Sequence, residues 1–132
     1  MILSYQRVEP LLLPVLRAAL PGVEFRTVWD ETLAAPCRQV VLCAEAGGME
    51  SPVTRSVTLR VDCTVLRADG TGDWQAAMLL FDHVERIIIS HGADSPLVHA
   101  AHQAGPARIT ADGRTSAYGI ISISLAGVPA GD

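Results

Sequence analysis

The amino-acid sequence predicts an α+β fold, in which a mostly antiparallel sheet of four to five strands carries two helices packed on one face. Three observations lead to this prediction. Two segments carry apolar residues at helical spacing, several others alternate apolar with polar residues, and turn residues separate them in the order helix, two or three strands, helix, two strands. That order favours helices gathered on one side of a sheet. At 132 residues, the chain is expected to form one domain, residues 1–132.

The first helix is expected over residues 8–20, where apolar side chains recur at i, i+3, i+4 and i+7. Pro10 suits the first turn of a helix. Pro14 is less favourable, because a proline inside a helix removes one hydrogen bond and crowds the preceding turn. We therefore expect the helix to begin near Pro10 or to kink at Pro14, and Leu20-Pro21-Gly22 to end it.

Three strands are predicted between the two helices, at residues 23–29, 38–44 and 55–66. The third gives the clearest signal, because its apolar side chains alternate with polar ones and so lie on one face of the strand. That alternation predicts one buried face and one face that is wet or reserved for a partner. Residues 46–54 hold two glycines and a proline, and we expect an exposed loop or a mobile hairpin arm there.

The second helix is expected to follow Asp73, a good N-cap residue, and to end near His91-Gly92. Its apolar stripe consists of Trp74, Ala77, Met78, Phe81, Val84 and Ile88. Two further strands are predicted, at residues 97–103 and around 121–125. Gly105-Pro106 and an Asp112-Gly113 turn lie between them.

Composition argues against several classes of function. The net charge of -4, with both signs mixed along the chain, disfavours a sequence-independent nucleic-acid binder, which needs clustered cations. Residues 1–5 lack the basic start of a signal peptide, and no apolar run approaches the roughly 18 residues of a membrane span. Cys37, Cys43 and Cys63 have no C-x-x-C spacing, so we expect reduced and mostly buried thiols.

The sequence predicts no catalytic, metal or cofactor site. On a helix, His99 and His102 would share a face and could bind one metal together. On the strand expected there they point to opposite faces, because their offset is odd. Asp30 and Glu31 form an adjacent acidic pair that acid–base chemistry could use, although adjacent acids in a loop are more commonly solvated. The glycine-rich residues 69–73 match neither phosphate-binding glycine motif and are expected to form a turn and helix cap.

Four segments give the chain its order of elements. They are a first helix ending LRAALPGVEF, a strand entered through proline in APCRQVVLCAEAGG, the strand VTLRVDCTVLRADG leading into the helix DWQAAMLLFDHVERII, and the closing segment AGPARITADGRTSAYGIISISLAG. This order resembles that of the tail terminator proteins (minor tail or head-tail joining proteins) of long, non-contractile-tailed bacteriophages. The resemblance covers about residues 8–127 and rests on element order more than on fixed residues. The region at 92–96 is shorter than in the family.

The resemblance implies a non-enzymatic virion protein, made in the host bacterial cytoplasm and placed at the head-proximal end of the tail. Family members form a hexameric ring there. One face docks on the tail tube protein and stops polymerisation, the other accepts the head–tail connector or stopper, and DNA passes the lumen without specific binding. Ring contacts in the family involve sheet edges and mobile loops. The corresponding interface residues here are Gly47, Gly48, Met49, Glu50, Arg55, Arg60 and Asp62.

The residues themselves agree with an assembly role but leave alternatives open. A closed ring needs two different patches on each subunit, and a 49% hydrophobic composition suits such contacts. Arg60 and Asp62 would offer complementary charges to a neighbour, although a solvated face fits them equally well. A head-completion or stopper protein of the phage neck is one alternative. A small oligomeric enzyme is another, supported if Asp30, Glu31 and a histidine share a cleft, and a small-molecule-binding module is a third.

Overall fold

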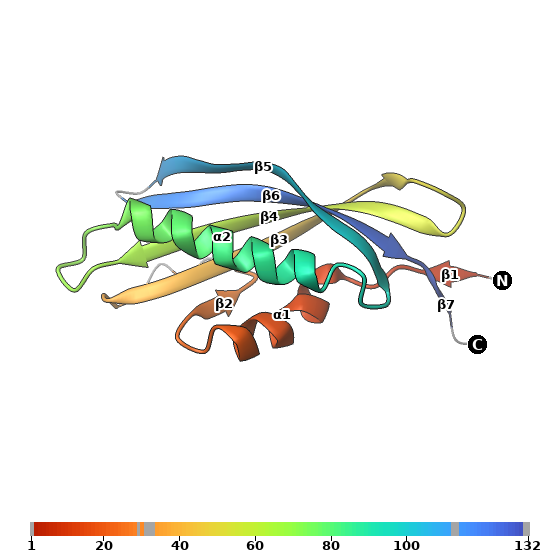
Figure 1. The fold of residues 1–132 in the computed structure, drawn as a ribbon, viewed down its shortest axis with the longest axis horizontal. Helices are drawn as coiled ribbons and strands as arrows, with labels where there is room; N and C mark the ends of the chain where they lie inside the picture. The colour runs from red at the N-terminus through yellow and green to blue at the C-terminus, as the bar shows by residue number, and fades with distance from the viewer. Residues whose placement is uncertain (1, 29, 31–33, 112–113, 131–132) are drawn as a thin grey trace.

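The chain folds as one five-stranded sheet with two helices and a separate two-stranded pair (Figure 1). The computed structural model describes residues 2–28, 30, 34–111 and 114–130, and these counts refer to that part of the chain. The elements are β1 (Leu3–Ser4), α1 (Val8–Ala19), β2 (Glu24–Arg26), β3 (Cys37–Met49), β4 (Thr54–Leu66), α2 (Trp74–Ser90), β5 (Leu97–Ala111), β6 (Arg114–Ala126) and β7 (Val128–Pro129). Within the described residues, no helix combines the length and the apolar character that crossing a membrane requires.

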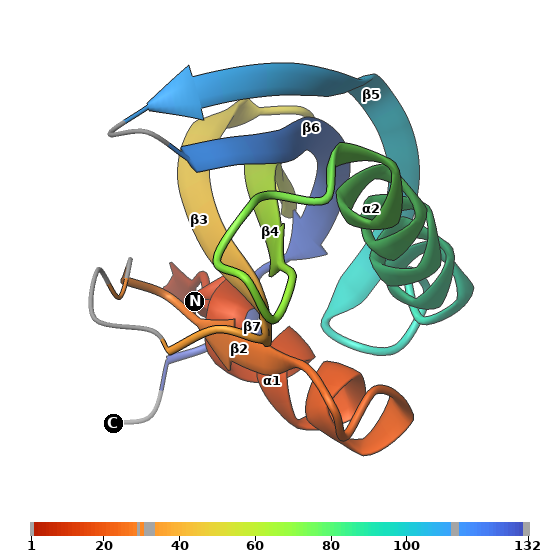
Figure 2. The same ribbon diagram turned by 90° about the vertical axis from the view of Figure 1, so that its left-hand side faces the viewer.

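The predicted α+β class is confirmed. The sheet order is β2-β3-β4-β6-β5, and every pair is antiparallel except β2 with β3. Helix α2 packs on β4, β5 and β6, while α1 packs on β2 and β3 and also touches α2. Figure 2 shows the sheet strongly curved, with the two helices on the same side of it. That side is called the inner face below, and the opposite side is the outer face.

The hydrophobic core lies between the inner face and the helices. Alternate residues of β4 point into it, as the sequence pattern predicts. Phe81 of α2 is fully buried at the centre, and Gly119 of β6 makes room for its ring, because a Cβ at that position would collide with the ring carbons. Strand β4 contributes Val57, Leu59, Val61, Cys63 and Val65, and the helices contribute Val8, Leu12, Leu16, Ala77, Leu80, Phe81, Val84 and Ile88.

Both helices begin and end close to the predicted positions. Helix α1 begins at Val8, so Pro10 lies in its first turn, and it continues through Pro14. The N-cap prediction for α2 is confirmed, because the Asp73 carboxylate accepts a hydrogen bond from the Ala76 N–H at 3.1 Å. The predicted stripe of α2 omits Leu80, which is fully covered, and includes Trp74 and Met78, which are half-buried at the rim of the core.

Two strands are longer than predicted. Strand β3 continues to Met49 and β4 begins at Thr54, so of the two alternatives expected at 46–54 the structure has a hairpin arm rather than an exposed loop, with a short turn at 50–53. Strand β5 continues through Gly105-Pro106, where the register with β6 shifts between Ala104 and Ala107. Because β5 lies at the sheet edge and Pro106 sits in the bulge, the missing N–H breaks no ladder bond. Gly105 has φ +86°, a conformation that favours glycine.

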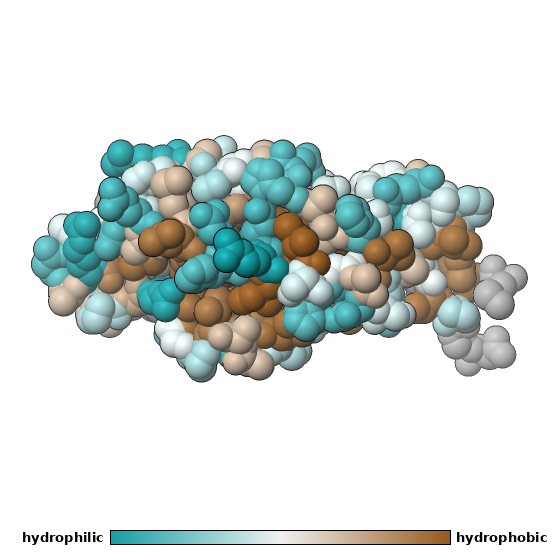
Figure 3. Space-filling model, in the orientation of Figure 1, coloured by the Kyte–Doolittle hydropathy of each residue, from teal (hydrophilic) through white to brown (hydrophobic). Residues whose placement is uncertain are grey.

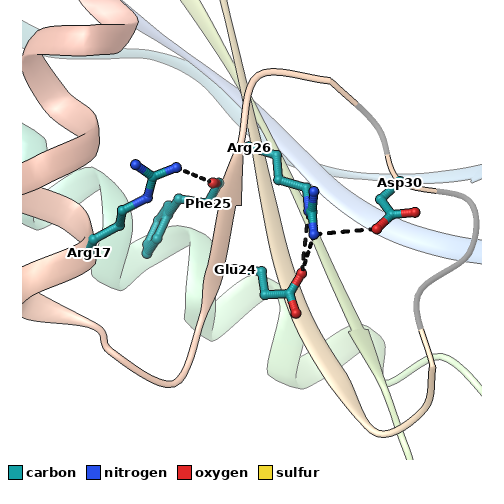
Figure 4. A network of polar contacts seen from close by, with 5 residues as sticks. All are labelled: Arg17, Glu24, Phe25, Arg26 and Asp30. Carbon is teal, nitrogen blue, oxygen red and sulfur yellow. Dashed lines mark hydrogen bonds and ion pairs between the residues drawn. The ribbon is translucent and has the colours of Figure 1, made fainter.

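Strand β2 is shorter than predicted, covering three residues at the other edge of the sheet. Two arginines make polar contacts at this strand, one from α1 and one from β2 itself (Figure 4). Arg17 of α1 donates a hydrogen bond to the Phe25 carbonyl at 3.1 Å, and Arg26 forms ion pairs with Glu24 at 2.9 Å and Asp30 at 3.4 Å. Short, charged edges of this kind resist further strand pairing. Trp29, the last residue of the strand predicted at 23–29, and the Asp112-Gly113 turn lie outside the described residues.

Candidate interaction surfaces

The seven residues predicted as an interface fall on three separate surfaces. Gly47, Gly48, Met49 and Glu50 lie on the hairpin between β3 and β4. Arg60 and Asp62 lie on the outer face of β4, whereas Arg55 of the same strand points to the inner face near the start of α1. The odd offset between Arg55 and the other two explains the separation, because strand side chains alternate between faces.

The outer face carries a compact cluster of Arg60, Asp62 and Tyr118. Arg60 Nε lies 3.0 Å from the Asp62 carboxylate, and its guanidinium stacks over the Tyr118 ring at 4.5 Å from the centroid. The hydrogen bond that Arg60 donates to Asp62 raises the pKa of Arg60, and partial burial opposes that rise. Because both charges are satisfied within the chain, this cluster needs no partner to be stable.

The outer face is not exposed to solvent along its whole length, which corrects the expectation that this face of β4 is solvated. Thr64 is fully buried there, and its hydroxyl lies 2.7 Å from that of Ser116 on β6. Gln39 of β3 pairs with Thr64 across the ladder and is also fully buried. One end of the outer face is therefore covered by the chain itself, while the stretch around Arg60 remains exposed.

The hairpin formed by residues 47–54, called the arm below, lies beyond the ends of both helices (Figure 1). Met49 and Val53 expose 50% and 55% of their surface, and Glu50 is exposed beside them. The turn has defined hydrogen bonds: the Ser51 hydroxyl accepts from the N–H groups of Val53 at 3.2 Å and of Thr54 at 3.0 Å. An ordered turn thus presents two apolar side chains to solvent.

Glycines allow the strands of the arm to approach closely. A Cβ at Gly47 would collide with the Ser56 hydroxyl of β4, and that hydroxyl donates a hydrogen bond to the Gly48 carbonyl at 3.2 Å. Both glycines are therefore part of a strand rather than of a loop. The need for glycine is steric at Gly47, whereas a Cβ at Gly48 would meet open space.

A pocket of about 330 Å³ lies at the base of the arm, between the start of α1 and the strands. The Arg55 guanidinium lies over the Tyr5 ring, 5.1 Å from its centroid. Arg55 Nε and Tyr5 Oη are both buried, and neither has a hydrogen-bond partner in the described part of the chain. The remaining lining is Gln6, Arg7, Val8, Glu9, Ala44, Ala46, Val57 and Leu125.

Glu9 is the buried acid of this pocket, with 4% of its surface exposed. Its carboxylate accepts hydrogen bonds from Arg7 at 3.0 Å and from the Ala44 N–H at 3.4 Å. Burial alone would raise the pKa of Glu9, but hydrogen bonds from its own backbone, from Arg7 and from Ala44 outweigh that effect and hold the pKa below its usual range. The ionised carboxylate caps a free N–H of β3.

The histidines on β5 lie on opposite faces, as predicted. His99 pairs across the ladder with Ser124, whose side chain belongs to the outer face. His102 lies on the inner face, and its Nδ1 is 2.6 Å from the Glu85 carboxylate of α2. Among the described residues, no three His, Cys, Asp or Glu side chains come together in a way that could hold a metal ion.

The remaining candidate residues are separate from one another. Asp30 lies beside Arg26, and Glu31 falls outside the described residues. Cys63 is buried as expected, and burial raises the pKa of its thiol. Cys43 is exposed on the outer face opposite Arg60, so the expectation of mostly buried thiols is wrong for it.

The helices also show apolar side chains at the surface, among polar ones (Figure 3). Leu79 exposes 61% of its surface and Ile89 40%, both on α2. A second hollow of about 330 Å³ lies where α2 meets the end of α1. It is lined by Leu20, His83, Arg86, Ile87 and Ser90.

Compared with protein-family models and with curated proteins, the chain matches none. Its surfaces are therefore the basis for proposing a function. These surfaces offer ion pairs, arginines stacked on tyrosine rings, exposed apolar side chains on the arm, and a pocket lined by residues with unsatisfied hydrogen-bond donors. Sequence reasoning missed Tyr5, Arg7 and Glu9. The one available signal was Glu9 itself, a charged residue next to Val8 on the apolar side of the first helix.

Proposed function

We propose that this chain is a structural virion protein that forms a ring at the head-proximal end of a phage tail tube. In that position it stops tube polymerisation and offers a surface to the head connector. The proposal joins the resemblance in element order with the surfaces described above. The fold class agrees with that order: helix α1, strands β2 to β4, helix α2, and strands β5 and β6.

The observation that carries the proposal is the arm. It extends past both helices, and it ends on exposed Met49 and Val53. Burial of apolar surface lowers the free energy by about 25 cal/mol per Å², so a partner surface that covers the tip of the arm is favoured. An ordered hairpin that presents apolar side chains fits a contact element better than a catalytic one.

The uncovered outer face suits a docking surface. Arg60 and Asp62 neutralise each other within the chain, so the face remains soluble before assembly and adds no unpaired charge when it is covered. The net charge of -4 fits a lumen through which DNA passes, since a basic surface would retain phosphate. Two distinct patches, the arm and the outer face, meet the requirement of a closed ring for unlike contacts.

Electron microscopy of particles assembled from the encoding genome, with and without this gene, tests the proposal. Without the gene we expect overlong tubes of uneven length that are not attached to filled heads. Restoring the gene is expected to restore uniform tails. Tails of normal, uniform length in the deletion would overturn the proposal.

Complementation with arm variants makes the test specific to the surface. Met49→Ser together with Val53→Ser removes apolar area from the tip and leaves the turn hydrogen bonds in place, since these involve the Ser51 hydroxyl and backbone groups. We expect this variant to leave tubes overlong. Leu79→Ser is the matched control, because it removes a similarly exposed apolar side chain from α2. Equal complementation by both variants would rule out the arm as the contact.

A further inference from the structure

We propose that the pocket of Tyr5 and Arg55 binds a carboxylate, and that this carboxylate is an acidic side chain of a neighbouring copy of this chain. The proposal rests on the proposed function, because a neighbouring copy is present only if the chain assembles. It assigns to the ring a specific polar contact.

Tyr5 and Arg55, which both line the pocket, have buried hydrogen-bonding atoms without a partner among the described residues. In the described part of the chain, four buried side-chain polar atoms have no hydrogen-bond partner. Two belong to Gln39, and the other two are Tyr5 Oη and Arg55 Nε, which belong to two residues that both line one pocket. A buried donor without an acceptor is destabilising, so an acceptor supplied from outside the subunit is favoured.

The charges that line the pocket do not balance within the described residues of one subunit. Arg7 and Glu9 neutralise each other at 3.0 Å, and Glu9 also accepts from the Ala44 N–H. Arg55 forms no ion pair among the described residues. The pocket therefore carries one uncompensated positive charge, which a single carboxylate would balance. The carboxylate of Glu9 on the wall disfavours a dianion.

Arg60 and Arg55 of the same strand differ in whether a carboxylate lies beside them in the described residues. Arg60 stacks on a tyrosine and binds the Asp62 carboxylate. Arg55 stacks on a tyrosine in the same way but has no carboxylate beside it in the described residues. The pocket thus has the same stack of arginine on tyrosine as the outer-face cluster but lacks its carboxylate. One carboxylate oxygen would accept from Tyr5 Oη and the other from Arg55 Nε, and apolar lining such as Val57 and Leu125 would strengthen both bonds.

A second copy of the chain can supply the acid. The chain has 14 acidic residues against ten basic ones, and several acids are exposed. They include Glu45, Glu50, Asp69 and Asp82. In a closed ring, each subunit presents unlike patches to its two neighbours, so a pocket on one subunit would face an acid on the next. The pocket lies at the base of the arm, next to the surface already assigned to contacts.

The test compares assembly and stability in three purified variants. Tyr5→Phe keeps the ring stacked on Arg55 and removes only a hydroxyl that is unsatisfied in the subunit. We expect its thermal unfolding temperature to stay the same or rise slightly, while sedimentation shows assembly weakened about 10-fold. Arg55→Gln is expected to weaken assembly roughly 10- to 100-fold. Arg86→Gln removes an exposed guanidinium from α2 with the same change in net charge, and it should assemble like the wild type.

Sodium acetate serves as a free carboxylate probe at constant ionic strength. We expect acetate, compared with chloride, to dissociate wild-type rings and to have little effect on rings of Arg55→Gln. Acetate could instead change the environment of Tyr5 in the free subunit while Tyr5→Phe and Arg55→Gln assemble as well as the wild type. In that case the pocket takes free anions and the proposal is overturned.

The two proposals fail in distinguishable ways. If Tyr5→Phe and Arg55→Gln form rings as readily as the wild type, the carboxylate contact is overturned and the proposed function still stands. A wild-type chain that forms no ring, alone or on tail tubes, would overturn both. Each exposed acid is then replaced by its amide, alone and together with Arg55→Gln. The acid that enters the pocket is the one whose replacement adds nothing to the effect of Arg55→Gln on assembly.

Discussion

The two faces of β4 differ in what satisfies their side chains. On the inner face, Leu59, Val61 and Cys63 are fully buried against the helices. On the outer face, Arg60 and Asp62 satisfy each other and remain partly exposed. The inner face therefore determines whether the chain folds, while the exposed stretch of the outer face around Arg60 can change its chemistry at small cost to stability. A strand that alternates in this way separates the requirements of folding from those of contact.

The largest expected difference between the faces is in thiol reactivity. Cys43 on the outer face is exposed, whereas Cys63 on the inner face is buried and its pKa is raised by burial. In the native protein, we expect the alkylation rate of Cys63 to be lower than that of Cys43 by a factor on the order of 10³ or more, because labelling of Cys63 requires unfolding. Peptide mass spectrometry after timed alkylation measures both rates, and urea should abolish the difference. Comparable native rates would break the comparison.

Truncation of the core should have the next largest effect. Phe81→Ala removes the ring at the centre of the inner face, and we expect the free energy of unfolding to fall by about 3–5 kcal/mol. Leu79→Ala on the same helix is the control, because that side chain is largely exposed, and it should change stability by no more than about 0.5 kcal/mol. Urea unfolding followed by circular dichroism checks both values. Similar losses in the two variants would mean that α2 is not anchored through Phe81.

Glu9 gives an intermediate and pH-dependent effect. Its pKa is lowered in the folded state from an ordinary value of 4.5, so the ionised form favours folding. The contribution is complete above the unfolded pKa and is lost as the pH falls through the lower, native pKa. We expect Glu9→Gln to cost on the order of 1–2 kcal/mol at pH 7, and the difference from wild type to shrink below pH 4. Urea unfolding of both proteins at pH 7, 5, 4 and 3 would reveal a constant difference if this account is wrong.

The smallest effect is expected on the outer face. Arg60→Gln removes the ion pair with Asp62 and the stacking on Tyr118, and we expect a loss of about 0–1 kcal/mol because the pair is largely solvated. The same urea measurement applies. A loss as large as that of Phe81→Ala would show that the outer face also determines the fold.

The inner face of the sheet was predictable because burial imposes a strict alternation, as in β4 from Val57 to Val65. The ends of β3 and β5 were not, because Gly47-Gly48 and Gly105-Pro106 are typical of turns when read locally. In the structure they are held in strands by cross-strand pairing, a bulge and close backbone approach. Tertiary pairing overrode local preference at both places.

The candidate surfaces were predictable only in part. The arm could be found from its glycines, and the opposite placement of His99 and His102 from the parity of their offset. The pocket could not, because Tyr5 and Arg55 lie far apart in the sequence, and no periodic pattern connects a segment before a helix to the start of a strand. Residues brought together by the closing of a sheet have no local signature.

The sheet order has a consequence for how quickly the chain folds. Strands β3 and β4 pair as sequence neighbours, and so do β5 and β6, so each pair closes a short stretch of chain. The central pairing joins Thr54 to Ala126 across the whole of α2 and both later strands. Because closing a long loop loses more chain entropy than closing a short one, this central seam is expected to form after the two hairpins and to limit the rate at which the five-stranded sheet closes.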